Sequence, residues 1–387
     1  MSPAPRIPLS APDIGAAERA LLLETFDAGW VSSVGPVVER FEQAFAESVG
    51  LGHATAVSSG TAALHLALSM LDLKPGDAVI APSLTFIGGV SPILQAGARP
   101  IFVDVEPTSW NLDPGLIEPA FEHADREGLR VRAIVPADLY GQCCDIGAIR
   151  AVADARGVPV ILDSAEAVGA TLDGRPAGQG ASAAAYSFNG NKIVTTGGGG
   201  MLASDDGALI RRARYLATAA RLPAVHYEHA EAGFNYRLGS LAAAVGLGQL
   251  GSLETKVARR RAIFERYVER LAHLPGLGFA PEAKGRRHTR WLTAIQLDPG
   301  QARATPEALR LGLEADNIES RPVWKPMHLQ PAFAADRPND RRGGAALMIG
   351  GGVSERVFTR GLCLPSGSGL TDDEVDRVCD RIIAVLG

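Results

Sequence analysis

The stretch 186-YSFNGNKIVTTGGGGMLAS-204 places one lysine, Lys192, among small polar residues and follows it with four consecutive glycines, Gly197 to Gly200. Glycine inside a regular element loses stability through backbone entropy, so this run indicates a turn or a close approach of the backbone to another group. A lysine in this setting could clamp a phosphate, act as a buried nucleophile, or remain a solvated surface charge. Residues elsewhere in the sequence distinguish these possibilities.

The length and composition are those of a globular protein that can form one large core and a smaller second one, with 387 residues of which 46% are hydrophobic. The net charge of -5 argues against a nucleic-acid-binding surface. No apolar run reaches membrane-spanning length, and the start MSPAPRIPLS lacks the pattern of a signal peptide. From these two observations we expect no membrane partner. The four cysteines lack metal-binding spacing, so we expect reduced thiols, no metal site and a cytoplasmic location.

Short apolar or β-branched segments alternate with helical patterns up to about residue 205. The predicted strands are residues 53–59, 77–83, 99–105, 131–136, 158–163, 183–189 and 199–204. Helical patterns such as residues 60–73 separate them, and this alternation with continuous apolar strands predicts an α/β fold with a mostly parallel seven-stranded sheet. We expect this large domain to span residues 1–274.

A second pattern begins after a long predicted helix over residues 239–272. A strand at 290–298 and a helix at 305–318 follow, and the last helix opens at 371-TDDEVDRV-378 with a capping box formed by Thr371 and Glu374. We expect a smaller α+β domain over residues 275–387, with the N-terminal segment 1–30 packed on it.

Polar residues follow two of the predicted strands. Gly60 and Thr61 open a helix directly after a strand, so the free N–H groups there suit a phosphate, although an ordinary N-cap explains the same residues. Asp163 ends the apolar strand 158-VPVILD-163, where open α/β sheets form ligand crevices. A buried carboxylate at that point either needs a cationic partner, such as a protonated heterocycle nitrogen, or caps the next turn.

Lys192 does not fit a nucleotide-binding loop, because it follows Asn191 and precedes Ile193 rather than completing GxxxxGK[ST]. A lysine that forms a Schiff base with an aldehyde cofactor needs a desolvated amine, a phosphate cradle and an acid for the heterocycle. Lys192, Gly60–Thr61 and Asp163 supply these three roles from three strand ends.

The chain resembles the DegT/DnrJ/EryC1/StrS family of pyridoxal-phosphate-dependent nucleotide-sugar aminotransferases over nearly its full length. The matching segments are 29-GWVSSVGPVVERFEQAFA-46, 59-SGTAALHLAL-68, 82-PSLTFIGGVSPI-93, 139-LYGQ-142, 163-DSAEAVGA-170, 187-SFNGNKIVTTGGGGM-201 and 226-HYEHAEAGFNYRLGS-240. The resemblance implies the aspartate aminotransferase-like fold, PLP fold type I. Segments 290-RWLTA-294, 318-IESRPVWKPMHLQPAF-333 and 361-GLCLPSG-367 look most like the bacillosamine-type UDP-sugar C4 transaminases.

The resemblance also implies a role for each matching residue near the cofactor. Lys192 corresponds to the Schiff-base lysine, Asp163 to the acid that pairs with the pyridinium nitrogen, and Glu166 to a residue near the ring. Phe86 matches an aromatic residue that stacks on the ring's other face. The implied phosphate contacts are Gly60, Thr61 and Ser187, joined by Asn235 from the neighbouring subunit of a homodimer, and Asn189 is a further implied cofactor-binding residue. The segments that line the nucleotide-sugar site contain Trp30, Val31, Ser32, Ser33, Arg237, Lys325, Met327 and His328.

The implied reaction moves an amino group from an amino acid, L-glutamate by family analogy, to the 4-keto carbon of a nucleotide-linked 4-keto-6-deoxy sugar. Pyridoxamine phosphate is the implied intermediate, and UDP-2-acetamido-2,6-dideoxy-4-keto-hexose is the expected substrate. The alternatives are a perosamine-type transaminase acting on GDP-4-keto-6-deoxymannose, a sugar dehydratase of the same fold, and a non-catalytic regulatory or scaffold protein. Dehydratases carry histidine where this chain has Lys192.

Two departures from the family pattern concern the substrate more than the chemistry. Asp138, in 138-DLYG-141, replaces a histidine, and Gly239 and Ser240 replace serine and asparagine.

Overall fold

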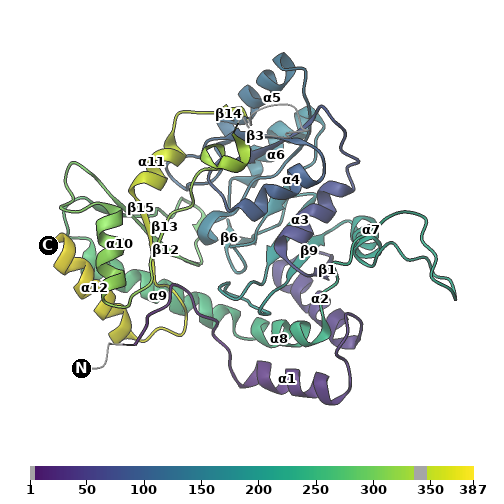
Figure 1. Ribbon diagram of the computed structural model, residues 1–387, viewed down its shortest axis with the longest axis horizontal. Coiled ribbons are helices and arrows are strands. Elements are labelled where there is room, and N and C mark those ends of the chain that lie inside the picture. The colour runs from purple at the N-terminus through teal and green to yellow at the C-terminus, as the bar shows by residue number, and fades with distance from the viewer. Residues whose placement is uncertain (1–4, 335–346) are drawn as a thin grey trace.

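The computed structural model describes residues 5–334 and 347–387 (Figure 1). Its larger unit is built on two four-stranded sheets that β-bridges between Ile134 and Val160 and between Ala137 and Asp163 join edge to edge. The combined order is β1 (His53–Val57), β9 (Gly200–Ser204), β8 (Ala183–Ser187), β5 (Ile161–Asp163), β4 (Arg130–Ile134), β2 (Asp77–Pro82), β3 (Arg99–Val103) and β14 (Leu347–Ile349).

The predicted α/β fold with a mostly parallel sheet is confirmed. Only β9 runs antiparallel to its neighbours, β1 and β8, among the paired strands of this combined sheet in the described residues. β14 adds an eighth strand beside β3, which the sequence pattern did not predict.

Helices cover both faces of this sheet because successive side chains of its strands enter different cores. In β2, Ala78 and Ile80 belong to one core, whereas Val79 and Ala81 belong to the other. The first core lies under α2 (Pro36–Val49), α5 (Ile117–Arg126) and α6 (Ile146–Arg156). The second lies under α3 (Gly60–Ser69), α4 (Ser91–Gln95) and α7 (Gly207–Ala217).

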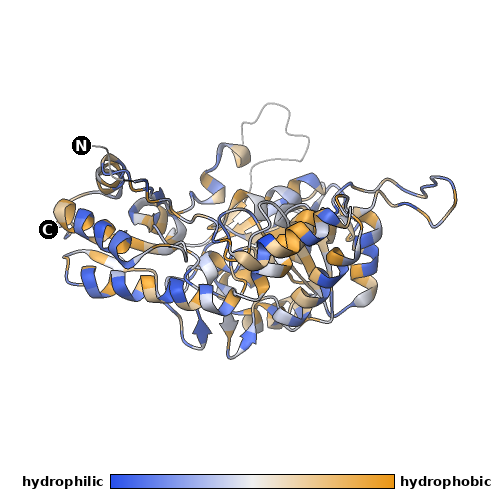
Figure 2. Cartoon of the chain, turned by 90° about the horizontal axis from the view of Figure 1, so that it is seen from below, coloured by the Kyte–Doolittle hydropathy of each residue, from blue (hydrophilic) through white to orange (hydrophobic). Residues whose placement is uncertain are grey.

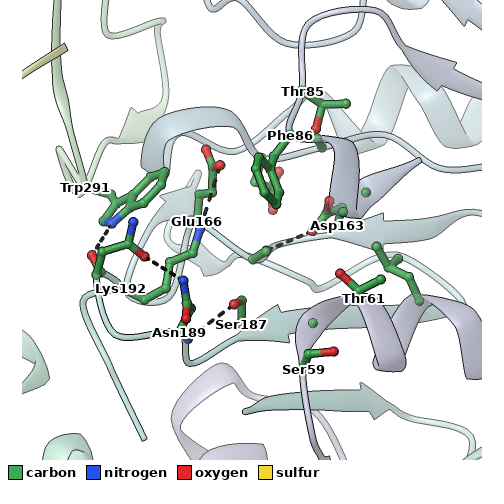
Figure 3. A pocket seen from close by; sticks show the side chains of 18 of the residues that line it. Ser59, Thr61, Thr85, Phe86, Asp163, Glu166, Ser187, Asn189, Lys192 and Trp291 are labelled. Atoms are coloured by element: carbon green, nitrogen blue, oxygen red, sulfur yellow. Dashed lines mark hydrogen bonds and ion pairs between the residues drawn. The ribbon is translucent and has the colours of Figure 1, made fainter. Parts of the chain in front are cut away.

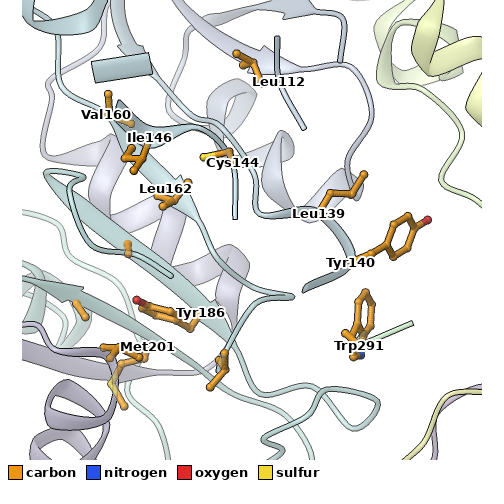
Figure 4. Packing of buried hydrophobic residues seen from close by; sticks show 14 of the residues in the cluster. Leu112, Leu139, Tyr140, Cys144, Ile146, Val160, Leu162, Tyr186, Met201 and Trp291 are labelled. Carbon is orange, nitrogen blue, oxygen red and sulfur yellow. The ribbon is translucent and has the colours of Figure 1, made fainter. Parts of the chain in front are cut away.

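The aromatic packing of α2 fixes the strand that leads to the lysine. Phe45 lies on the buried face of α2, with its ring centroid 4.9 Å from that of Tyr186 and 5.1 Å from that of Phe188. Figure 4 shows Tyr186 in the core beside Met201. Because side chains alternate along a strand, Ser187 between these two aromatic residues faces away from this core.

The smaller unit has its own sheet and core. Its sheet is antiparallel and has the order β10 (Leu277–Phe279), β12 (Thr293–Leu297), β15 (Gly361–Leu364) and β13 (Arg321–Pro322). α10 (Pro306–Ala315) and α12 (Asp372–Leu386) cover it, and α11 (Val353–Arg360) precedes β15. The capping box predicted at Thr371 and Glu374 is confirmed.

The long helix predicted over residues 239–272 is two helices, α8 (Ser240–Leu250) and α9 (Leu253–Leu271). α9 joins the two units, since Val257 packs in the main core while Ile263 and Tyr267 pack in the smaller one. Ala294 and Cys363 of the smaller sheet also pack in the main core, so core packing does not divide the chain sharply at residue 274.

The N-terminal segment divides between the two units. Ile7 pairs with Ile318 and is buried in the smaller core. α1 (Ala16–Asp27) instead packs on α8, because a Cβ at Gly248 would lie 2.9 Å from the Glu18 Cα atom and only glycine permits this approach. The expectation that all of residues 1–30 pack on the smaller unit is therefore corrected for α1.

An arm formed by residues 221–235 leaves the body between α7 and α8 (Figures 1 and 2). Its Tyr227 side chain is 79% exposed. A small antiparallel sheet of β6 (Thr171–Leu172), β7 (Arg175–Pro176) and β11 (Arg286–Arg287) completes the strands. None of the helices in the described residues has the length and apolar character needed to cross a membrane.

Replacing Thr371 by alanine should lower the free energy of unfolding by about 1 kcal/mol, because the Glu374 N–H loses its hydroxyl acceptor. Denaturant unfolding of the full chain measures this difference. Thr371→Ser keeps the hydroxyl and should retain most of the stability, so equal stability of the alanine and serine variants would contradict the capping role.

Candidate active site

A pocket opens where β5 and β8 end and α3 begins (Figure 3). Two parallel strands side by side bring Asp163 and the Ser187 end of β8 to the same edge of the sheet. The structure places eight of the predicted cofactor residues on the pocket wall: Gly60, Thr61, Phe86, Asp163, Glu166, Ser187, Asn189 and Lys192.

The start of α3 offers uncommitted hydrogen-bond donors. Ser59 caps the helix, since its Oγ accepts a 3.0 Å hydrogen bond from the Ala62 N–H. Within the described chain, the backbone N–H groups of Gly60 and Thr61 and the Thr61 hydroxyl have no hydrogen-bond partner. These donors and the positive end of the helix dipole suit a phosphate group.

The position of Gly200, the last of the four glycines, shows why part of this run has to be glycine. A Cβ atom at this position would collide with the backbone of Ser59 and Gly60, so glycine lets β9 pass directly against the start of α3. Gly197 has a φ of +79°, a left-handed conformation that glycine adopts without strain. The run therefore serves a turn and a close backbone approach, as the sequence indicated.

Lys192 is buried in this pocket with a carboxylate beside its amine. Its Nζ lies 3.8 Å from Glu166 Oε1. Burial lowers the pKa of the Lys192 amine, and the carboxylates of Glu166 and Asp163 oppose that change. A lysine with a lowered pKa keeps a larger neutral fraction, which is the form that attacks carbonyl carbons and accepts protons.

Asp163 lies at the end of β5 against a glycine turn. A Cβ at Gly89 would collide with its carboxylate, so the backbone of the 3-10 helix Ile87–Gly89 lies directly on that group. Burial, followed by the neighbouring Glu166 carboxylate, raises the pKa of Asp163 to about 7. A carboxylate in this position gains from a cationic partner in the pocket.

Glu166 is held by a strained turn. Tyr140 has a φ of +53°, which is uncommon for a bulky residue, and its N–H donates a 2.7 Å hydrogen bond to Glu166 Oε2. The Tyr140 hydroxyl oxygen accepts a 3.0 Å hydrogen bond from the backbone N–H of Trp324. The turn thereby connects Glu166 to a segment of the smaller unit.

Asp138, the residue that departs from the family pattern, is buried behind Asp163. Its carboxylate accepts hydrogen bonds from the Ser164 hydroxyl at 2.7 Å and from the Cys144 N–H at 2.8 Å. Burial raises the pKa of Asp138 to about 6. The bond from Ser164 holds the loop that carries Asp163 and Glu166, and the bond from Cys144 closes the turn that contains Tyr140.

Two tryptophans outside the predicted set of site residues, Trp291 and Trp324, line the pocket. Both stack on Tyr140, with ring centroids 6.2 Å and 5.9 Å away. They lie in the segments 290–294 and 318–333 that carry the finer part of the resemblance, which is the one signal in the sequence that points to them.

Three of the predicted substrate residues do not lie on the pocket wall of this chain. Arg237 does not line the pocket, because its Nη1 is 2.9 Å from Glu42 Oε1 in a buried ion pair. Met327 is 2% exposed and packs in the second core. His328 lies between the Ser83 hydroxyl, 2.6 Å from its Nδ1, and Glu355 Oε1, 3.0 Å from its Nε2.

The remaining predicted residues lie outside the pocket of this chain. Lys325 and Asn235 are exposed, and Asn235 lies at the base of the arm. Residues Trp30, Val31, Ser32 and Ser33 form a largely exposed loop before α2.

The residues on the pocket wall fit pyridoxal phosphate. The start of α3 with Ser187 would hold the phosphate, Asp163 would face the ring nitrogen, and Lys192 would reach the aldehyde carbon. The open helix N-terminus and the raised pKa of Asp163 are the observations on which this fit depends.

Asp163→Asn should stabilise the cofactor-free chain at pH 8 by up to about 4 kcal/mol. The ordinary pKa of this carboxyl is 3.8 and burial raises it to about 7, so the folded chain holds an extra proton between these values. Stability contributed by that proton is full at low pH and is lost as the pH rises through 7. Denaturant unfolding as a function of pH measures the effect.

Asp77→Asn is the matched control, because ion pairing with Arg130 and Arg132 and a hydrogen bond from the Lys74 N–H lower the pKa of buried Asp77. This variant should lose stability at pH 8. Destabilisation of the same sign in both variants would contradict the description of Asp163.

Comparison with known proteins agrees with this geometry. Residues 12–383 match the DegT/DnrJ/EryC1/StrS aminotransferase family. The chain is 44% identical to the putative pyridoxal phosphate-dependent aminotransferase EpsN of Bacillus subtilis (strain 168), over 98% of this chain and 95% of that protein. It is 38% identical to the GDP-perosamine synthase of Caulobacter vibrioides, over the full length of both chains.

Among solved structures, the aminotransferase TlmJ from Streptoalloteichus hindustanus has a TM-score of 0.85 and 32% identity, with 97% of each chain covered. This similarity confirms the expected aminotransferase fold. The chain therefore belongs to the DegT/DnrJ/EryC1/StrS family and is a pyridoxal phosphate-dependent sugar aminotransferase.

Proposed function

We propose that this enzyme transfers an amino group from an amino acid, L-glutamate by family analogy, to the 4-keto carbon of a nucleotide-linked 4-keto-6-deoxy sugar. The observation that carries the proposal is one pocket that contains a buried amine, a buried acid and an open helix N-terminus, namely Lys192, Asp163 and the start of α3.

Two sugars are candidates. UDP-2-acetamido-2,6-dideoxy-4-keto-hexose is favoured by the segments around Trp291 and Trp324, which look most like the bacillosamine-type enzymes. GDP-4-keto-6-deoxymannose is favoured by similarity to GDP-perosamine synthases, at 38% identity for the one from Caulobacter vibrioides.

When bound, pyridoxal phosphate supplies an aldehyde carbon that an amine can bond and a ring that withdraws electrons from the reacting carbon. Asp163 would face the ring nitrogen and keep it protonated. Once it is free, the Lys192 amine would take a proton from the Cα atom of the amino donor. It would then deliver this proton to the former aldehyde carbon of the cofactor. Its lowered pKa increases the neutral fraction of the amine, which is the form that accepts the proton.

We further propose that the active enzyme is a homodimer with shared sites. The described residues that line the pocket include three carboxylates, Asp138, Asp163 and Glu166, and one cation, Lys192. Phosphate and diphosphate groups need further cations, which a second copy can provide at a shared boundary. An exposed apolar cluster in α1 and the following loop, with Phe26 59% and Val31 60% exposed, suits an interface.

Lys192→Ala should abolish transamination and the covalent trapping of the cofactor by borohydride, because no other amine lines the pocket in the described residues. Peptide mapping by mass spectrometry locates the trapped adduct in the wild type. An adduct on another side chain would contradict the proposal. Product masses with UDP- and GDP-linked 4-keto-6-deoxy sugars distinguish the two candidate substrates.

Mixing inactive Lys192→Ala and Asn235→Ala chains tests the shared site. If Asn235 acts in the partner's pocket, each mixed dimer has one intact site, and random exchange should restore about a quarter of wild-type activity. Activity that stays absent after exchange, verified by mass spectrometry of the intact mixed dimer, would contradict the shared site.

A further inference from the structure

Trp291 contacts two consecutive residues of the lysine loop (Figure 3). Its indole N–H donates a 2.8 Å hydrogen bond to the carbonyl oxygen of Asn191. The amine of the next residue, Lys192, lies 3.7 Å from the centroid of its ring. One side chain thus fixes both the backbone before the lysine and the position of its amine.

The surroundings of Trp291 hold it rigidly. The side chain is 1% exposed, and its ring is stacked on Tyr140 at an interplanar angle of 24° (Figure 4). Its carbonyl oxygen accepts a 2.7 Å hydrogen bond from Arg260. Arg290, immediately before it, has a φ of +53°, an uncommon conformation that such packing has to support.

Arg260 also supports the second donor to the Asn191 carbonyl. Its Nη2 donates to the Ser10 hydroxyl at 3.1 Å, and that hydroxyl donates to the Asn191 carbonyl at 2.8 Å. Segments far apart in the sequence therefore converge on the peptide that precedes Lys192. This concentration of contacts exceeds what packing an aromatic side chain requires.

The ring and the carboxylate next to Lys192 act differently on its charge. The face of an indole attracts an ammonium ion and has little attraction for a neutral amine. Glu166, 3.8 Å from the amine, also attracts the ion but can accept its proton. The indole face has no basic lone pair, so it stabilises the charged lysine without competing for the proton that the lysine must return.

We propose that Trp291 is a positioning residue that holds the released Lys192 side chain over its indole ring as an ammonium ion between two proton transfers. This inference rests on the proposed function, since it assigns a place to the lysine while the reacting carbons change. The amine leaves this place when it gives up its proton.

The rate at which acetic anhydride labels Lys192 in the cofactor-free full chain tests this inference. Only the neutral amine reacts, so loss of the ring should raise the labelling rate at neutral pH. Trp291→Leu should raise it about thirtyfold, the factor expected for a desolvated cation–π contact. Trp291→Phe keeps a weaker ring face and should give a smaller rise. Mass spectrometry of the Lys192 peptide measures both rates.

Trp324→Leu is the matched control, because Trp324 lines the same pocket and stacks on the same tyrosine. Its labelling rate should rise less than that of Trp291→Leu, because of the two rings only that of Trp291 lies against the Lys192 amine in the described chain. An equal rise in Trp324→Leu and Trp291→Leu would mean that opening the pocket causes the effect and would overturn the inference. An unchanged rate in a folded Trp291→Leu chain, verified by thermal unfolding, would overturn it too.

These outcomes are independent of the proposed reaction. A wild-type chain that failed to transaminate any 4-keto sugar would contradict the proposed function, while the labelling rates would still report how Trp291 acts on the lysine.

Discussion

A buried amine and two buried carboxylates share one pocket, where burial disfavours the charge of each group and where the amine and the carboxylates favour one another's charge. Burial lowers the pKa of Lys192 and raises the pKa values of Asp163 and Glu166. These shifts favour the neutral form of each group, and Asp163, whose pKa is raised to about 7, exchanges its proton near neutral pH. Proton transfer by one lysine depends on this balance, because the same group must accept and release a proton.

The fold produces this balance with strand ends and close backbone contacts. The parallel pairing of β5 with β8 places Asp163 opposite Ala185, two residues before Ser187. Gly89 and Gly200 remove the Cβ atoms that would separate Asp163 and the start of α3 from neighbouring backbone. The strands β5 and β8 thus fix where these groups lie along the sheet edge. The two glycines set how closely neighbouring backbone approaches them.

The part of the site that follows from local pattern was predictable. Gly60, Thr61 and Asp163 each end or follow a strand, and the topology of a parallel sheet brings such residues to one edge. Trp291 and Trp324 were not predictable from local pattern, since they lie at least 99 residues beyond Lys192 and enter the pocket from the smaller unit.

For Arg237, the family resemblance identified the residue but not its contact. Arg237 lies in a matching segment, but its guanidinium donates a hydrogen bond to the carboxylate of Glu42, which is 195 residues away in sequence. The packing of α1 on α8 likewise depends on the close approach of Glu18 to Gly248. No hydrophobic periodicity in the sequence reveals this contact.

The charge of the pocket also limits where sugar specificity can arise. The roles proposed for Lys192, Asp163 and Glu166 concern the reacting carbon and the cofactor ring, which are the same whichever nucleotide the sugar carries. A uridine and a guanosine differ in the base, on the far side of the diphosphate from that carbon, whereas Phe86, Trp291 and Trp324 line the pocket itself. We therefore expect the residues that distinguish nucleotides at the rim of the pocket or on a second chain. Exposed Lys325 and the arm of residues 221–235 are placed for such a role, and both can differ among relatives without disturbing the buried charges.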